Sequence, residues 1–236
     1  MADLQTLRRL AIIGVVLSVI FGIAVVVLSI AAVGNLEAMV FGDVETVLRA
    51  GPQAAPLWRA AMLADMLNSY LFLLPLALYG HRLLRDRKPW LADLGLAGAL
   101  AYIFIGAASA AALAMAGSSL IASYAEAGPA EQAAITTSFA MLRDIFYFGI
   151  WQLLDGITAG TWVFTSGLLL LPDRPRLGRL LVVLGIGFWL AAAMTMLDVH
   201  STAVLVAIFT GVVVVWLLWV LLSRGRQPGQ TVQPGT

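Results

Sequence analysis

Six long apolar runs, separated by short polar segments, make up most of the chain. They lie near residues 10–33, 59–80, 91–116, 145–171, 178–197 and 202–222. Each run has roughly the 20 residues that an α-helix needs to cross the hydrocarbon core of a bilayer. We therefore predict an all-α fold, a polytopic membrane protein with six transmembrane helices. The first run is longer than the apolar core of a signal peptide, so we expect it to be retained as a helix.

The segments between the runs differ on the two sides of the predicted bundle. Two are short and carry a proline where a new helix should begin, which predicts plain helical hairpins; they read HRLLRDRKPW and LPDRPRLGR. On the other side, NLEAMVFGDVETVLRAG spaces apolar residues helically beside acids, as in an amphipathic helix on a membrane surface. Helical sequence after Gly128, joined to the fourth run, would extend roughly 65 Å, so we expect a bend near Arg143 or an outward projection.

The uneven distribution of basic residues predicts the orientation. Six spans put both termini on one side, and with the N-terminus in the cytoplasm only Arg49, Arg59 and Arg143 fall outside. We predict a bacterial cytoplasmic (inner) membrane protein with both termini cytoplasmic. Residues 1–222 form its single transmembrane domain, and the polar residues 223–236 form a disordered tail. The basic residues on the predicted inner side are Arg8, Arg9, Arg82, Arg85, Arg87, Lys88, Arg174, Arg176, Arg179, Arg224 and Arg226.

The composition excludes several classes of function. Hydrophobic residues make up 61% of the chain and charged residues 11%, against about 25% charged residues in a soluble domain, so the lipid bilayer is the predicted partner. No basic stripe with interleaved aromatic residues is present, which excludes nucleic acid. Without cysteine, and with His81 and His200 at opposite ends of the predicted bundle, we expect no metal and no cofactor. No catalytic motif is present, so an enzyme is the less favoured class.

Two stretches resemble a known family. They are LWRAAMLADMLNSYLFLLPLALYGHRLLRD at 57–86 and the hairpin FGIWQLLDGITAGTWVFTSGLLLLPDRPRLGRLLVVLG between the fourth and fifth runs. With an arginine at the start of the second helix, an FLLPL run and a tryptophan-containing fourth helix, the chain resembles a bacterial family of six-helix integral membrane proteins of unknown function (domain-of-unknown-function family 4386). The resemblance implies the same topology over most of the chain and supplies no activity.

Two acidic residues lie inside predicted spans, where an unpaired charge costs about 2.5 kcal/mol or more. Asp65 is near the outer end of the second helix, and Asp155 is near the middle of the fourth. Arg59 and Arg143 are the basic residues predicted nearest to Asp65, so we expect one of them to pair with it. The predicted ligand-binding residues are Arg59, Asp65, Asn68, Arg143, Trp151, Gln152 and Asp155.

Four glycines of the fourth helix fall within about 20° of one line along its surface. Such a surface lets another helix approach closely. The predicted helix-packing residues are Gly149, Gly156, Gly160 and Gly167. A polar and aromatic stripe that includes Gln152 and Asp155 lies about 120° away, where it could line a cavity.

These features support two interpretations. In the first, the protein binds or moves a small molecule, lipid or proton at a polar intramembrane site between the second and fourth helices. In the second, it is a structural or interaction subunit that uses the glycine face to form a homodimer or to join a membrane complex. The polar residues also allow a purely structural role, in which Asp65 pairs with an arginine and Asp155 is held neutral through Gln152 and Thr158. The sequences LADML and LLDGI do not match an intramembrane aspartyl protease.

Overall fold

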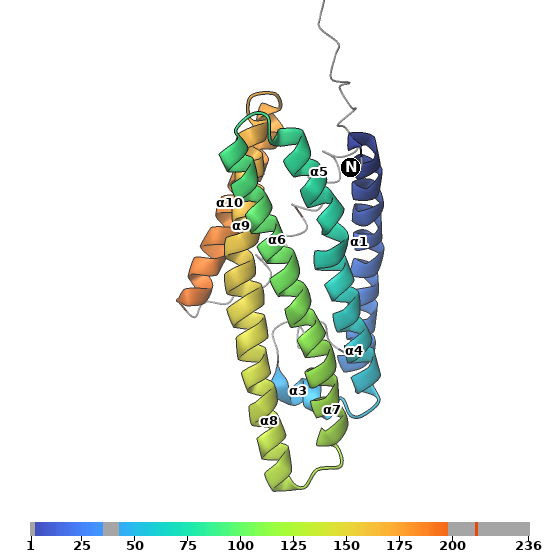
Figure 1. Ribbon diagram of the computed structural model, residues 1–236. Coiled ribbons are helices and arrows are strands. Elements are labelled where there is room, and N and C mark those ends of the chain that lie inside the picture. The colour runs from blue at the N-terminus through green and yellow to red at the C-terminus, as the bar shows by residue number, and fades with distance from the viewer. Residues whose placement is uncertain (1–2, 35–42, 198–210, 212–236) are drawn as a thin grey trace, which may run out of the picture.

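The computed structural model describes residues 3–34, 43–197 and Gly211, and most of this part of the chain forms five long helical rods (Figure 1). Each rod is long and apolar enough to cross a membrane; they are Leu4–Val33, Ala54–Leu84, Pro89–Tyr124, Pro129–Leu170 and Pro175–Met196. Within the described ranges there is no strand, and the all-α prediction is confirmed there. The sixth predicted span, 202–222, lies outside the described residues except for Gly211, as does the predicted tail at 223–236.

The rods contain the following α-helices, with π-helical or 3-10 turns joining those that share a rod. They are α1 (Leu4–Val33), α4 (Ala54–Asp65), α5 (Leu74–Leu84), α6 (Pro89–Ala112), α7 (Ser118–Tyr124), α8 (Pro129–Arg143), α9 (Asp155–Leu170) and α10 (Pro175–Met196), with the short helix α3 (Val44–Arg49) between the first two rods. Along the bundle, α1 packs on α4 and α5, α6 packs on α5 and α9, and α9 packs on α10.

Local sequence explains where the rods begin and end. Pro89, Pro129 and Pro175 each occupy the first turn of a helix, where the missing N–H is not needed. At the start of α1 the Asp3 carboxylate accepts a hydrogen bond of 2.5 Å from the Thr6 N–H. At its end, Gly34 adopts a left-handed conformation with φ of 77° and donates its N–H to the Ile30 carbonyl.

The rod Ala54–Leu84 changes its helical form in the middle. A π-helical turn, Met66–Tyr70, is followed by a 3-10 turn, Leu71–Leu73, before α5 begins. Pro75 lacks the N–H that would bond to the Leu71 carbonyl, which instead accepts from the Leu74 N–H. Tyr70 leaves the helical region, with φ of −128° and ψ of −74°. The break directs the Tyr70 side chain into the bundle.

The rod Pro129–Leu170 is continuous and projects beyond α4 at one end of the bundle (Figure 1). Its π-helical segment, Asp144–Leu154, begins directly after Arg143, where the sequence predicted an irregularity. Joining α8 to α9 gives a rod of roughly 63 Å at 1.5 Å per residue. The projecting part packs on one side against α3 and α7, where Ile135 and Phe139 are buried.

Two hydrophobic clusters fill the bundle, one toward each end. One contains Tyr70, Tyr102, Trp162 and the surrounding residues of α5, α6 and α9. The other is built around Trp58 and Phe139 and includes Val47 and Leu48 of α3. The amphipathic helix predicted in this region is therefore present as α3, but its apolar side is covered by the protein, because Val47 and Leu48 are both 0% exposed. The first part of the predicted amphipathic segment, residues 35–42, lies outside the described ranges.

The end of the bundle where α5 and α9 end and where α6 and α10 begin carries most of the basic residues, and we call it the basic end. Its two hairpins lie side by side and are joined by an ion pair between Arg87 and Asp173. Arg87 also donates a hydrogen bond of 2.5 Å to the Leu169 carbonyl. The opposite end, which carries α3, is called the α3 end.

Candidate functional site

A hydrogen bond between Asp155 and Tyr70 lies at the centre of the polar residues inside the bundle. Asp155 is the first residue of α9, directly after the π-helical segment, and its side chain is only 6% exposed. The Tyr70 hydroxyl donates to Asp155 Oδ2 over 2.7 Å. Asp155 Oδ1 is also buried and has no hydrogen-bond partner among the described residues. The carboxyl group is thus buried with one oxygen satisfied and the other available.

The α6 helix makes room for Tyr70. A Cβ atom placed on Gly106 would lie 1.9 Å from a carbon of the Tyr70 ring, so only glycine leaves enough space at this position. The Tyr70 and Tyr102 rings lie with centroids 5.0 Å apart. The Tyr102 hydroxyl donates to the Ser69 carbonyl over 2.9 Å, at the irregular turn where backbone groups need other partners. Tyr70 is therefore held against Gly106 and Tyr102 of α6, and Tyr102 is held by the Ser69 carbonyl.

A second carboxyl group, that of Asp65, lies one turn before this break. Its Oδ1 accepts a hydrogen bond of 2.7 Å from the Ser69 hydroxyl, which in turn accepts one of 3.1 Å from Asn68. Ser18 of α1 donates to the Asn68 carbonyl at 2.8 Å, with a contact of 3.0 Å to its side-chain oxygen. A short hydrogen-bonded chain therefore joins α1 to the Asp65 carboxyl group.

The partner of Asp65 in the structure is the Ser69 hydroxyl and not the arginine that the sequence predicted. Arg59 donates from Nε and Nη2 to the Ser118 hydroxyl, at 3.1 and 3.0 Å, and Arg143 pairs with Asp144 at 2.8 Å. Arg59 and Asp65 are six residues apart on one rod, which puts their side chains about 120° apart around the helix axis. The hydrogen bonds and ion pairs of the described residues therefore correct the predicted pairing.

The remaining predicted site residues lie on the π-helical segment. Gln152 is buried, and its side-chain oxygen accepts from Thr195 of α10 at 3.3 Å. Trp151 packs edge-on against Tyr147, with ring centroids 4.7 Å apart. The Trp151 Nε1 atom is buried and has no hydrogen-bond partner within the described ranges. Thr158 donates to the Leu154 carbonyl instead of supporting Asp155. The structure thus brings Asp155 to a tyrosine that sequence reasoning did not single out.

The glycine face of α9 packs on α10 of the same chain. A Cβ on Gly156 would lie 2.9 Å from the Ala192 Cβ, and one on Gly160 would lie 2.6 Å from the Trp189 ring. At Gly167 the nearest atom is the Val182 backbone nitrogen, at 2.7 Å. By contrast, a Cβ on Gly149 would meet only the Asp144 carbonyl, at 3.5 Å. The surface considered for a partner chain is thus occupied by α10 along these three glycines.

The chemistry available at the site is that of two carboxyl groups, two tyrosine hydroxyls and an indole N–H. Among the residues that the structure describes, no group of three or more histidine or acidic side chains is arranged to hold a metal ion. The ion pairs given by those residues do not include Asp65 or Asp155. Groups of this kind can hold a proton or a small cation.

Comparison with known proteins adds no relative, because no family model, curated protein or solved structure matches the chain. The resemblance to the six-helix family therefore stays a prediction.

Proposed function

We propose that this chain is an integral membrane protein that binds and transfers a proton at the Asp155–Tyr70 pair between the second and fourth rods. The observation that carries the proposal is the environment of Asp155. Asp155 is 6% exposed, its Oδ2 has the uncharged Tyr70 hydroxyl as a partner, and its Oδ1 has no hydrogen-bond partner among the described residues. A buried charge without a partner is costly, so a proton is the natural companion of this group.

Exposed apolar side chains support placement in a bilayer. Only 22% of the most apolar 18-residue stretch of α1 is buried against the rest of the described chain. The side chains of Ile13, Ile23 and Val27 are each more than half exposed. An apolar surface of this size is unusual for a protein surrounded by water. Lipid would cover these side chains, while the polar residues of the site face other helices. We infer that all five described rods are transmembrane.

The distribution of charge supports the orientation. The basic end carries Arg85, Arg87 and Lys88 in one hairpin and Arg174 and Arg176 in the other. Short loops rich in arginine and lysine stay on the cytoplasmic side of membranes. The basic end is thus the cytoplasmic end in this proposal, and the α3 end faces outward in a bacterial inner membrane.

Proton transfer fits the site better than binding of an organic ligand or a lipid. The polar atoms around Asp155 are supplied by closely packed side chains, including the Tyr70 ring held against Gly106 and Tyr102. A proton needs a carboxyl group and a hydrogen-bonding neighbour, and both are present. The other carboxyl group of the site, that of Asp65, lies on the second rod nearer the α3 end and accepts a hydrogen bond from Ser69.

The proposal is tested by proton flux into liposomes that contain the purified protein, driven by a potassium diffusion potential. We expect flux above that of empty liposomes, and we expect Asp155→Asn to reduce it to the background. Asp144→Asn is the matched control, because Asp144 lies on the same rod but is exposed and paired with Arg143. Equal flux in the wild-type protein and Asp155→Asn would refute the role of Asp155.

A further inference from the structure

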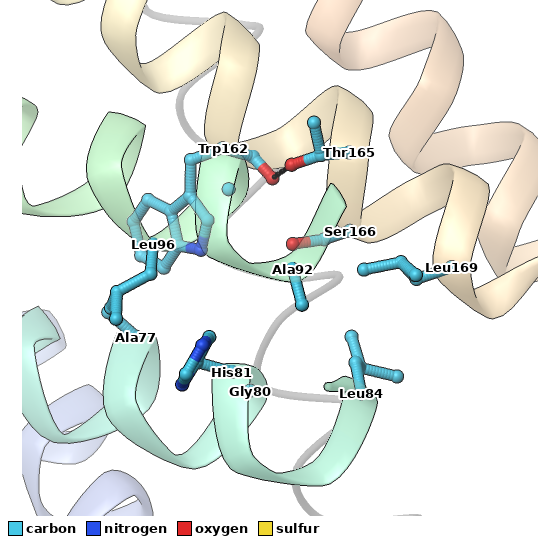
Figure 2. A pocket seen from close by; sticks show the side chains of 11 residues that line it. Ala77, Gly80, His81, Leu84, Ala92, Leu96, Trp162, Thr165, Ser166 and Leu169 are labelled. Atoms are coloured by element: carbon cyan, nitrogen blue, oxygen red, sulfur yellow. Dashed lines mark hydrogen bonds between the residues drawn. The ribbon is translucent and has the colours of Figure 1, made fainter. Parts of the chain in front are cut away.

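A pocket opens between α5, α6 and α9 near the basic end of the bundle. Figure 2 shows His81 of α5 at this pocket, with the Trp162 ring and the Ser166 hydroxyl of α9 also lining it. The space suits about one water molecule rather than an organic ligand. The polar side-chain groups of its lining residues are the His81 imidazole, the Trp162 indole N–H and the hydroxyls of Thr165 and Ser166.

The His81 imidazole connects this pocket to the exterior of the bundle. Its Nε2 lies 2.8 Å from Asp93 Oδ1 of α6, while the His81 side chain is 15% exposed and that of Asp93 is 53% exposed. Arg85, on the same helix as His81, lies 3.6 Å from the same carboxylate oxygen. The third element of the pocket, α9, presents neutral hydroxyls at this level. A histidine with a carboxylate partner at a water-sized pocket is well suited to exchange protons.

The pocket and Asp155 share the same rods. Trp162 lines the pocket and follows Asp155 by seven residues of α9, which is about 10 Å along the helix. The Tyr102 ring lies between the two levels, with its centroid 6.4 Å from that of Trp162 and 5.0 Å from that of Tyr70. Three aromatic rings thus separate the pocket from the Asp155 carboxyl group in this structure.

We propose that His81 is the group that exchanges protons between the solution at the basic end and the Asp155 site. This inference rests on the proposed proton-transfer function. His81 takes a proton from water on one ring nitrogen, Asp93 stabilises the resulting imidazolium, and the other ring N–H gives its proton to a water molecule in the pocket. From there the proton reaches Asp155 when the Trp162, Tyr102 and Tyr70 rings move apart to admit water. The reverse sequence returns a proton to the solution. The bonds formed and broken are O–H and N–H bonds only, and no other reactant is needed.

The test compares proton flux in liposomes that contain wild-type protein, His81→Ala or Asp155→Asn. We expect His81→Ala to reduce flux by roughly tenfold or more, as for loss of a proton-transferring group. Free histidine, which carries an imidazole, should restore part of the flux of His81→Ala, whereas glycine at the same concentration should not. A merely structural role for His81 would give no such recovery. The fold of each variant is checked by its melting temperature.

The outcomes separate the two proposals. If His81→Ala keeps wild-type flux, or loses flux that free histidine does not restore, the role of His81 is overturned while the loss in Asp155→Asn still supports the site. If His81→Ala fails to fold, His81→Gln replaces it in the same comparison. Wild-type flux in Asp155→Asn overturns the proposed function itself, and absence of flux in the wild-type protein overturns both.

Discussion

Tyr70 and Asp155, which are 85 positions apart in the sequence, are joined by a hydrogen bond of 2.7 Å where two irregular helical segments meet. Tyr70 ends the π-helical turn Met66–Tyr70, and Asp155 follows the π-helical segment Asp144–Leu154.

Tyr70→Phe should destabilise the protein and slow proton flux. The change removes the donor to Asp155 Oδ2 and leaves the buried carboxyl group with no partner among the described residues. Losing one partner of a buried hydrogen bond costs about 1–3 kcal/mol. Equilibrium unfolding in mixed detergent micelles measures the loss. Tyr124→Phe is the matched control, because Tyr124 lies near the end of α7 outside the site, and it should change stability by much less.

Gly106→Ala should disturb the site without altering any polar group. The added methyl group would fall 1.9 Å from a Tyr70 ring carbon, so the ring must move away from its position beside Asp155. Overpacking of this kind typically costs about 1–3 kcal/mol. Gly128→Ala adds the same methyl group where no atom lies within 4 Å. Unfolding and flux measurements on both variants should separate them, and equal behaviour would contradict the assigned position of Tyr70.

Asp65 should be coupled in energy to Ser69 and not to Arg59. The Ser69 hydroxyl donates to Asp65, whereas Arg59 donates to Ser118. In a double-mutant cycle, Asp65→Asn with Ser69→Ala should give a coupling energy between about 0.5 and 3 kcal/mol. The cycle of Asp65→Asn with Arg59→Gln should stay below about 0.5 kcal/mol. The reverse order of the two values would restore the arginine pairing that the sequence suggested.

Cysteine labelling tests the orientation directly, because the natural chain contains no cysteine. Lys88→Cys puts a thiol in an exposed hairpin at the basic end, and Glu131→Cys puts one at the exposed start of α8. In intact cells, a membrane-impermeant maleimide should label the variant at position 131 and leave the one at position 88 unlabelled until the cells are opened. Labelling at position 88 in intact cells would reverse the proposed topology.

The sequence alone predicted the rods well, because their boundaries depend on local signals. Apolar runs of membrane length and the prolines at positions 89 and 175 specify five helices and two hairpins. The irregularity of the second rod also has a local cause, since Pro75 lacks the N–H that a regular helix would use. The close contacts at Gly156 and Gly160 also follow from spacing along one helix, although the identity of the neighbour, α10, does not.

The partners inside the bundle were harder to predict, because they depend on rotations around broken helices. A regular helix gives no reason to direct Tyr70 at Asp155, and the turn at Tyr70 has a non-helical φ of −128°. Charge alone favoured arginine for Asp65, yet helix geometry directs Arg59 elsewhere and a neighbouring hydroxyl suffices. One signal was present in the sequence, since Tyr70 directly follows Asn68 and Ser69 in the polar stretch after Asp65.

The most direct test of a proton held at Asp155 is the infrared spectrum of the purified protein at neutral pH. A protonated carboxyl group has a carbonyl band of its own, which shifts on hydrogen–deuterium exchange and is absent from a carboxylate. We predict that the wild-type protein shows such a band, that Asp155→Asn loses it, and that Asp144→Asn retains it. A spectrum in which Asp155→Asn leaves the band unchanged, or in which the wild-type protein has no band, would contradict the account.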